Sequence, residues 1–308
     1  MTDTDVIINK VAVIGCGLIG SSVVRAVRHA NAAAEIAIAD SDAHNLDKAR
    51  ELSLADSYHA AALDAVGDAD LVILAMPVGT MASVAAEISG GLKPGAILSD
   101  VGSVKSSVLK SVAPLVPAGV HFIPGHPVAG TEQSGPEAGF ASLFDGRWCI
   151  LTPPNDADPA AVEALSAFWA KLGSKVDIMT ADHHDLVLAI TSHVPHLIAY
   201  NIVGTANDLE TVTRSEVIKY SAGGFRDFTR IAASDPTMWR DVFLNNKEAV
   251  LEMLGRFSED LTALQRAIRW GDGDALFDLF SHTREIRKRI IDAGQDDEAA
   301  DFGRPHKD

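Results

Sequence analysis

Cysteine is scarce in this chain of 308 residues, which contains only Cys16 and Cys149. Two cysteines do not make the disulfide framework of a small secreted protein, and a reducing compartment fits them best. The first nine residues are polar and partly acidic, so we expect no signal peptide. No apolar run approaches the roughly 20 residues that cross a bilayer. These absences predict a cytoplasmic protein.

Positive charge is also in short supply. Lys and Arg together number 26 against 42 Asp and Glu, and the formal net charge is −16. This disfavours nucleic-acid binding, because phosphate neutralisation needs clustered cations, and it disfavours docking on an anionic membrane. A small anionic substrate remains compatible, since a few local cations can override the net charge. The hydrophobic share of 47% is that of an ordinary globular protein, and the length allows two domains.

The first half of the chain alternates short β-branched runs with helical patterns. The near-continuous apolar run at residues 71–76 is typical of a strand buried on both faces. The alternation predicts an α/β fold, with a Rossmann-type doubly wound parallel sheet over residues 1–180. The expected strands are residues 11–14, 36–40, 71–76, 96–100, 122–123, 148–151 and 175–179, and the expected helices are 18–29, 43–54, 81–88, 105–116 and 159–172.

The second half of the chain has a different pattern. Strand-like runs stop, and residues 181–207 form a long helical pattern that Pro195 interrupts. A polar, glycine-rich stretch at residues 221–234 separates it from further helical patterns. We expect an all-helical domain for substrate binding and dimerisation over residues 181–294, followed by an acidic, disordered tail over 295–308.

A G-x-G-x-x-G run lies between the first predicted strand and the first predicted helix. Asp40 follows its last glycine by twenty residues, at the end of the next strand, and this context indicates a dinucleotide-binding fingerprint. Gly15 allows the tight turn, Gly17 lets the backbone approach the pyrophosphate, and Gly20 permits close packing of helix on strand. The alternative is a glycine turn in a sheet protein without a cofactor. The expected cofactor-binding residues are Gly15, Gly17, Leu18, Ile19, Gly20, Asp40, Pro77 and Ser103.

Asp40 also bears on which dinucleotide is used. Its carboxylate suits the hydroxyls of the adenosine ribose and would repel a 2′-phosphate, with Asp42 close by and no Lys or Arg adjacent. The sequence therefore predicts NAD rather than NADP. Cys16, inside the glycine run, is interpreted as a small turn residue rather than a redox group.

Three segments carry side chains suited to chemistry. D-V-G-S-V-K, from Asp100 to Lys105, follows a predicted strand, where ligands of open α/β sheets bind. G-H-P-V-A-G-T-E, starting at Gly125, holds a histidine in a loop fixed by proline and glycine. T-S-H-V-P-H, starting at Thr191, places Ser192 and the last histidine four residues apart, on one helical face.

With the stretch G-G-F-R-D-F-T-R-I-A-A-S-D-P-T-M-W from Gly223 to Trp239, these segments resemble the prephenate and arogenate dehydrogenase family. The resemblance extends from about Val11 to Leu264. It implies an NAD-dependent enzyme of tyrosine biosynthesis that oxidatively decarboxylates prephenate or arogenate. Which of the two is preferred stays open.

The resemblance assigns roles to individual residues. His126 matches the catalytic histidine, and a neutral imidazole can accept the proton of the substrate C4 hydroxyl. Ser103 matches the serine that orients this histidine and touches the hydroxyl and the nicotinamide. Arg230 matches the arginine that holds the ring carboxylate. Its alternative is a structural ion pair with Asp227 or Asp235.

Further residues are assigned to the substrate pocket by the same resemblance. His196 and Ser192 would line it, His184 would support it, and Glu132 would lie near its mouth. Trp239 would form a wall, with core packing as the alternative. The complete substrate-binding prediction is Arg230, His196, Ser192, His184, Glu132 and Trp239.

The sequence also has to be weighed against other functions. We expect no catalytic metal, since His183 and His184 are adjacent and no zinc motif occurs. A β-hydroxyacid dehydrogenase or a pyrroline-carboxylate reductase also has two domains, and a non-catalytic NAD sensor would keep the same glycines. The apolar stripes of the helical half favour a homodimer, as the resemblance also implies.

Overall fold

The computed structural model describes residues 7–213 and 216–292. The chain divides into two compact units, Met1–Leu251 and Glu252–Asp308. All the predicted site residues belong to the first unit. The tail expected to be disordered, residues 295–308, lies outside the described residues.

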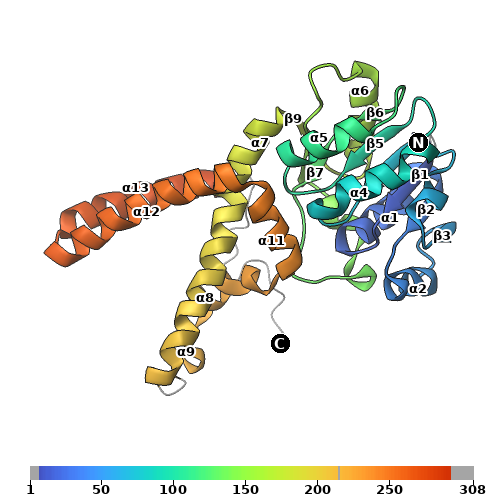
Figure 1. The fold of residues 1–308 in the computed structure, drawn as a ribbon. Helices are drawn as coiled ribbons and strands as arrows, with labels where there is room; N and C mark the ends of the chain where they lie inside the picture. The colour runs from blue at the N-terminus through green and yellow to red at the C-terminus, as the bar shows by residue number, and fades with distance from the viewer. Residues whose placement is uncertain (1–6, 214–215, 293–308) are drawn as a thin grey trace. The chain divides into compact units, whose positions relative to one another are not determined.

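A six-stranded parallel sheet forms the centre of the first unit (Figure 1). Its strand order, β3-β2-β1-β4-β5-β6, is that of a dinucleotide-binding Rossmann sheet. Every residue of β4 is buried, which explains its unbroken apolar sequence. The predicted fold class is thereby confirmed. The strands are β1 (Ile8–Ile14), β2 (Ala33–Ala39), β3 (Ser57–His59), β4 (Leu71–Leu74), β5 (Ile97–Asp100) and β6 (His121–Phe122).

Helices cover both faces of this sheet. On one face the core joins the sheet to α1 (Leu18–Ala30), α2 (Ala43–Glu51) and α6 (Pro159–Lys171). The core on the other face includes apolar side chains of α3 (Ala62–Val66), α4 (Val78–Ile88) and α5 (Ser106–Val112), with the short 3₁₀ turns η1 (Ser89–Gly91) and η2 (Ala113–Leu115) after the last two. The sheet is therefore buried on both sides, as its strand sequences require.

The last predicted strands do not extend the parallel sheet, and here the expectation was wrong. β7 (Gly125–Pro127), β8 (Trp148–Leu151) and β9 (Lys175–Ile178) form a separate three-stranded sheet. β7 runs antiparallel to β8 and pairs His126 with Ile150. His126 therefore lies in a strand, not in the expected loop. β7 has only three residues, among them a glycine and a proline, so its sequence alone does not predict a strand. It is a strand because it pairs with β8. The 3₁₀ turns η3 (Pro136–Ala138) and η4 (Ala141–Phe144) connect β7 to β8.

The remainder of the described chain is helical. The break expected at Pro195 lies just before it, as the π-helical turn η5 (Ala189–His193). Proline lacks an N–H and crowds the carbonyl four residues back, and a wider turn accommodates both. The polar stretch at 221–234 is also largely helical. The elements are α7 (Ala181–Leu188), α8 (Val194–Thr213), α9 (Glu216–Lys219), α10 (Gly223–Thr229), η6 (Arg230–Ala233), α11 (Pro236–Asn245), α12 (Lys247–Trp270) and α13 (Gly273–Asp292).

One helical stretch, Ala181–Leu209, is long and apolar enough to cross a membrane by length and composition alone. The sequence expectation concerned unbroken apolar runs, and polar residues such as His184, Asp185 and Ser192 interrupt this stretch, so only its average hydropathy reaches the level of a membrane span. His184, Asp185 and His193 are buried in this stretch, and Asp185 hydrogen bonds to the backbone at the start of α5. These contacts make the stretch a packing element of the first unit.

Apolar side chains remain exposed on the helices of the second unit. Trp270 is 75% exposed, and Ile268, Phe277 and Phe280 are each more than half exposed. A turn at Gly271, with φ of +67°, connects α12 to α13. Apolar surface of this extent is typical of a region that binds another protein surface.

Candidate active site

A cavity of about 1110 Å³ opens at the carboxyl ends of β1 and β4, where the strand order reverses. This is where open α/β sheets bind ligands. Most of the predicted cofactor residues, the catalytic pair and one substrate residue line it together. They are Gly15, Gly17, Leu18, Ile19, Asp40, Pro77, Ser103, His126 and Glu132.

The glycine run fits a dinucleotide phosphate. Gly15 has φ of +97°, and a Cβ there would lie 2.4 Å from the carbonyl oxygen of Ala75. A Cβ on Gly20 would lie 1.9 Å from the carbonyl oxygen of Gly15, so this glycine packs behind the turn. A Cβ on Gly17 would meet nothing within 4 Å. Gly17 also starts α1 without a side-chain cap, which leaves N–H groups of the first turn free for an anion.

Asp40 is held rigidly at the edge of this cavity. Its Oδ2 accepts a hydrogen bond from the backbone N–H of Cys16 at 2.7 Å, and its Oδ1 accepts one from that of Asp42 at 2.9 Å. Burial, with Asp40 nearby, raises the pKa of Cys16 to about 12. The thiol is therefore protonated at physiological pH, as the interpretation of Cys16 as a turn residue requires.

Lys48 also lines the cavity, and the sequence reasoning missed it. Its Nζ lies 2.7 Å from Glu51 and 3.2 Å from Glu137, so its charge is already compensated. Lys48 follows Asp40 by eight residues, and only the turn of α2 brings it to the cavity. A helical projection from Asp42, the N-cap of α2, would have placed it there.

His126 is 6% exposed and contacts a second histidine. Its Nδ1 lies 2.8 Å from Nε2 of His184, so its hydrogen-bond partner is His184 rather than the expected Ser103. Burial, together with the neighbouring His184 and the cation Lys105, holds the pKa of His126 well below its usual range. His126 is therefore neutral at physiological pH, which is the state of a general base.

His184 and Asp185 lie directly behind this histidine. Nδ1 of His184 is 2.8 Å from Oδ1 of Asp185, and both side chains are buried. Burial raises the pKa of Asp185, but hydrogen bonds from His184, Lys105 and Ser106 outweigh it and hold that pKa below its ordinary value. Asp185 is thus a carboxylate. The sequence reasoning did not select it, although it adjoins His184.

A buried ion pair fixes the strand that carries His126. The ammonium of Lys105 contacts Oδ2 of Asp100 and donates to the carbonyl of Gly125 at 2.6 Å. Asp100 accepts from the backbone N–H groups of Gly102 at 2.8 Å and Gly125 at 3.2 Å. Burial raises the pKa of Asp100 and lowers that of Lys105, and their mutual attraction opposes both shifts. The pair ties the end of β5 to β7. Asp100 and Lys105 are the first and last residues of the D-V-G-S-V-K segment, and this segment was the only feature of the sequence that indicated the ion pair.

The structure brings two predicted substrate residues together: Glu132, which lines the cavity, and Arg230, which is not among the lining residues. Nη1 of Arg230 lies 2.7 Å from Oε2 of Glu132. The ion pair considered for Arg230 therefore exists, but its partner is Glu132 and not Asp227 or Asp235. The Arg230 side chain is 51% exposed, so an incoming carboxylate can reach it.

His196, Ser192 and Trp239 form a group beyond the residues that line the cavity. The ring of His196 stacks on Trp239 with centroids 3.6 Å apart. Its Nδ1 bonds to the backbone carbonyl of Ser192 at 2.9 Å, so Ser192 contributes its main chain. Trp239 is 6% exposed and packs with Val104 and Val242, as the core-packing alternative predicts. The indole of Trp239 therefore packs against one face of the His196 ring.

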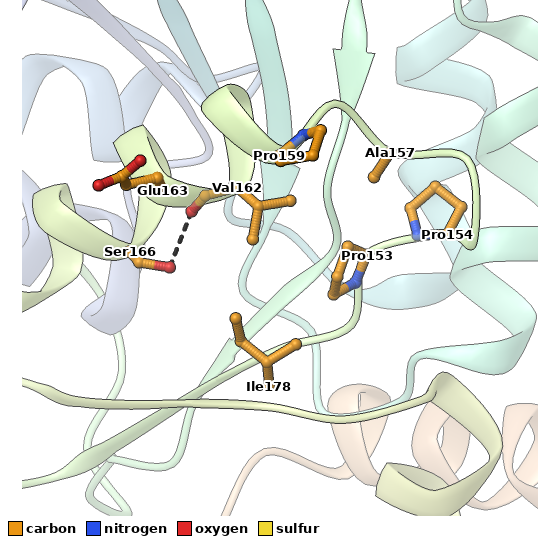
Figure 2. A pocket seen from close by; sticks show the side chains of 8 residues that line it. All are labelled: Pro153, Pro154, Ala157, Pro159, Val162, Glu163, Ser166 and Ile178. Atoms are coloured by element: carbon orange, nitrogen blue, oxygen red, sulfur yellow. Dashed lines mark hydrogen bonds between the residues drawn. The ribbon is translucent and has the colours of Figure 1, made fainter.

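Two further features of the described residues bear on chemistry. Within residues 7–213 and 216–292 no group of three His, Cys, Asp or Glu could hold a metal ion. A second hollow lies between α6 and β9 and contains Pro153, Pro154, Pro159 and Ile178 (Figure 2). Of the eight residues that line it, Glu163 is the only titratable one, and no predicted site residue is among them.

The fold and the cavity together define a class of protein. A Rossmann sheet has a glycine cradle at its switch point, an aspartate after β2 and a buried neutral histidine at the same cavity. This is the arrangement of a nucleotide-dependent dehydrogenase.

Comparison with protein families identifies the particular one. The prephenate dehydrogenase nucleotide-binding domain matches residues 23–178, and the prephenate dehydrogenase dimerization domain matches residues 180–282. The chain belongs to the prephenate dehydrogenase family. The predicted resemblance is confirmed, and the other two-domain dehydrogenase families are set aside.

Similar proteins cover nearly the whole chain. The cyclohexadienyl dehydrogenase of Zymomonas mobilis is 42% identical over 91% of this chain and 96% of its own length. The prephenate dehydrogenase of Bacillus subtilis is 31% identical over 89% of this chain and 74% of its own. The crystal structure of the Aquifex aeolicus prephenate dehydrogenase with hydroxyphenyl propionate and NAD⁺ superposes with a TM-score of 0.85, at 33% identity over 92% of this chain and 98% of that one.

Proposed function

We propose that this protein is an NAD-dependent dehydrogenase of tyrosine biosynthesis, which oxidatively decarboxylates prephenate to 4-hydroxyphenylpyruvate, or arogenate to tyrosine. The observation that carries the proposal is the neutral, buried His126, which lines the same cavity as the dinucleotide cradle. The relatives named cyclohexadienyl and prephenate dehydrogenase support the substrate class.

The cofactor contacts follow from the cavity. The free N–H groups after Gly17 would hold the pyrophosphate, and Asp40 would accept the ribose hydroxyls. A 2′-phosphate would face the Asp40 carboxylate, and Lys48, which lines the same cavity, is already paired with two glutamates. Leu18, Ile19 and Pro77 would contact the rest of the dinucleotide. When bound, NAD⁺ supplies the hydride acceptor.

His126 would act as the general base. Its free nitrogen accepts the proton of the C4 hydroxyl while hydride leaves C4, which gives a ring ketone. The ring carboxylate then leaves as CO₂, and its bonding electrons complete the aromatic ring and place a negative charge on the phenolic oxygen. That oxygen takes the proton back from His126. Ser103, which lines the same cavity, would orient the hydroxyl.

Arg230 would hold a carboxylate of the substrate. Its guanidinium is half exposed and bonds to Glu132, which lines the cavity. A substrate carboxylate can replace that glutamate with the same fork-like geometry. His196, backed by Trp239, would lie on the same side of the pocket, with Ser192 orienting its ring through a backbone carbonyl.

We further propose a cytoplasmic homodimer built through the helical part of the chain. The match of residues 180–282 to a dimerization domain supports it, as do the exposed Trp270, Phe277 and Phe280. Light scattering on the purified protein should give twice the chain mass. A mass of one chain at micromolar concentration would contradict the dimer.

The test of the activity is a direct assay. The purified protein is mixed with NAD⁺ and either prephenate or arogenate, and NADH and the phenolic product are both measured. We expect NADH and phenol in equal amounts with at least one of the two dienols, and a lower kcat/KM with NADP⁺. Failure of both dienols to reduce NAD⁺ would overturn the proposal.

A further inference from the structure

A continuous chain of hydrogen bonds leads from the catalytic histidine into the protein interior. His126 Nδ1 contacts His184 Nε2, and His184 Nδ1 contacts Asp185 Oδ1, each at 2.8 Å. The three residues are 6%, 0% and 4% exposed. Water therefore has little access to these bonds, and each proton along the chain has a fixed donor and acceptor.

The protons can be placed by starting from Asp185. Its Oδ1 accepts from the backbone N–H of Lys105 at 2.8 Å, and its Oδ2 accepts from that of Ser106 at 2.9 Å. A backbone N–H can only donate, so both carboxylate oxygens act as acceptors here. The proton in the bond to His184 must therefore lie on Nδ1 of that histidine.

The proton positions on His184 and His126 follow from that of the Asp185 bond. Burial lowers the pKa of His184 and of His126, so both rings are neutral. A neutral ring with its proton on Nδ1 has a bare Nε2, so Nε2 of His184 accepts and Nδ1 of His126 donates. Nε2 of His126 is then left without a proton. That is the nitrogen a general base needs.

We propose, on the basis of the function proposed above, that Asp185 is a positioning residue that sets the tautomer of His126 through His184. It touches neither substrate nor cofactor. It acts by making His184 an acceptor, which keeps the proton of His126 on Nδ1 and leaves Nε2 to take the substrate proton. The carboxylate also stabilises the imidazolium that forms during turnover, as in other carboxylate–imidazole pairs.

The other charged and titratable groups around the chain are otherwise engaged. Lys105 donates to Asp100 and to the carbonyl of Gly125. His193 Nδ1 lies 3.1 Å from the amide nitrogen of Asn246, which also donates to the backbone carbonyl of Asp185 at 2.8 Å. His196 bonds to Ser192. Asp185 is thus the anion that the His184–His126 pair contacts.

The decisive variant is Asp185→Asn. An amide has one oxygen and one NH₂ group. The NH₂ group must therefore take the place either of Oδ2, where it faces the N–H of Ser106, or of Oδ1, where it faces both the N–H of Lys105 and the ring of His184. In the first orientation the amide oxygen still accepts from Lys105 N–H and His184 Nδ1–H, so the tautomer is kept and only the negative charge that stabilises the imidazolium is lost. In the second orientation the amide donates to His184 Nδ1, which moves the His184 proton to Nε2 and forces His126 Nδ1 to accept. His126 Nε2 then carries a proton and cannot act as a base.

Asp182→Asn is the matched control. Asp182 lies one turn earlier on α7 and accepts from the hydroxyl of Ser106 at 2.6 Å, but it is exposed. We expect Asp185→Asn to lower kcat on the order of 10²–10⁴-fold, with KM and NAD⁺ affinity within about threefold of wild type. The acid limb of its kcat/KM profile should move to lower pH, because the imidazolium loses its carboxylate. Asp182→Asn should match the wild-type enzyme in all of these.

Equal kcat values for Asp185→Asn and Asp182→Asn would overturn the proposal. So would a loss in Asp185→Asn that is fully explained by a smaller folded fraction, with an unmoved pH profile.

A second measurement needs neither the Asp185→Asn variant nor a substrate. In the ¹⁵N-histidine-labelled wild-type enzyme saturated with NAD⁺, the His126 signals are assigned by their absence in His126→Asn. We expect the directly bonded proton on Nδ1. A proton on Nε2 would overturn the proposal even in an active enzyme. If the enzyme oxidises neither dienol, the proposed function fails while this spectrum still decides the tautomer.

Discussion

Replacing Gly17 by alanine separates cofactor binding from folding. In the free protein a Cβ at this position meets nothing within 4 Å, and the backbone, with φ of −75° and ψ of −161°, suits any residue. The free energy of unfolding should therefore change by no more than about 0.5 kcal/mol. The same methyl group would occupy the space through which the pyrophosphate approaches the N–H groups of α1. We expect NAD⁺ affinity to fall at least tenfold, which is about 1.4 kcal/mol.

Gly20→Ala provides the contrast. Its Cβ would lie 1.9 Å from the carbonyl oxygen of Gly15 and 3.3 Å from Cβ of Ala75, so the backbone of the turn has to move. Overpacking of this kind costs about 1–3 kcal/mol of stability. Calorimetric NAD⁺ titration and thermal unfolding of both variants are the assays. Wild-type NAD⁺ affinity in Gly17→Ala, or wild-type stability in Gly20→Ala, would refute the reasoning.

Three further predictions concern the charged groups. Arg230→Ala should raise the substrate KM by the equivalent of about 1.5–3 kcal/mol, with little change in melting temperature because its pair with Glu132 is half exposed; an unchanged KM, or an equal rise in the neighbouring Arg226→Ala, contradicts it. Lys105→Met should cost about 3–5 kcal/mol of stability in denaturant unfolding, since it leaves a buried carboxylate unpaired; a loss below 1 kcal/mol contradicts it. Because the pKa of His126 lies well below 6.5, kcat/KM should stay level as the pH falls through 6.5 and decline only below it. A midpoint at or above 6.5 contradicts this.

Local patterns were sufficient to predict five of the six strands of the main sheet. A strand such as β4 is buried on both faces, so its sequence is an apolar run that can be read without knowing its neighbours. β3 was not predicted, because its three residues, Ser-Tyr-His, are only partly buried and form no apolar run. The glycine fingerprint is equally local, because a turn, a helix start and an aspartate at fixed spacing make the cradle. The predictions for Gly15 and Asp40 depended on these local features, whereas the prediction for His126 came from the resemblance to a known family.

Long-range pairing was the part that the sequence could not show. β7 exists because β8 pairs with it, and its three residues have no pattern of their own. The partners of His126 and Arg230 are 58 and 98 residues away in the chain. A motif indicates which residue types gather at a site, but it does not indicate their hydrogen-bond partners. The partner of His126 depends on how α7 packs against β7, and that of Arg230 on how η6 lies against the segment after β7.

The π-helical turn illustrates a third kind of difference. Proline at position 195 indicated a disturbance in the helix, and the disturbance is there, but it is absorbed by the turn at Ala189–His193. The helix continues on both sides instead of ending. Because helical structure continues through the turn, His184 and His196 remain on one continuous helical stretch, where each can contribute to the site.

The most direct test of the account is the turnover of His126→Asn with prephenate and NAD⁺, measured beside its NAD⁺ affinity. If the neutral imidazole takes the hydroxyl proton, kcat should fall by roughly 10²–10⁴-fold while the dissociation constant for NAD⁺ stays at the wild-type value. Turnover at the wild-type rate would contradict the central claim, because the proton would then have another acceptor.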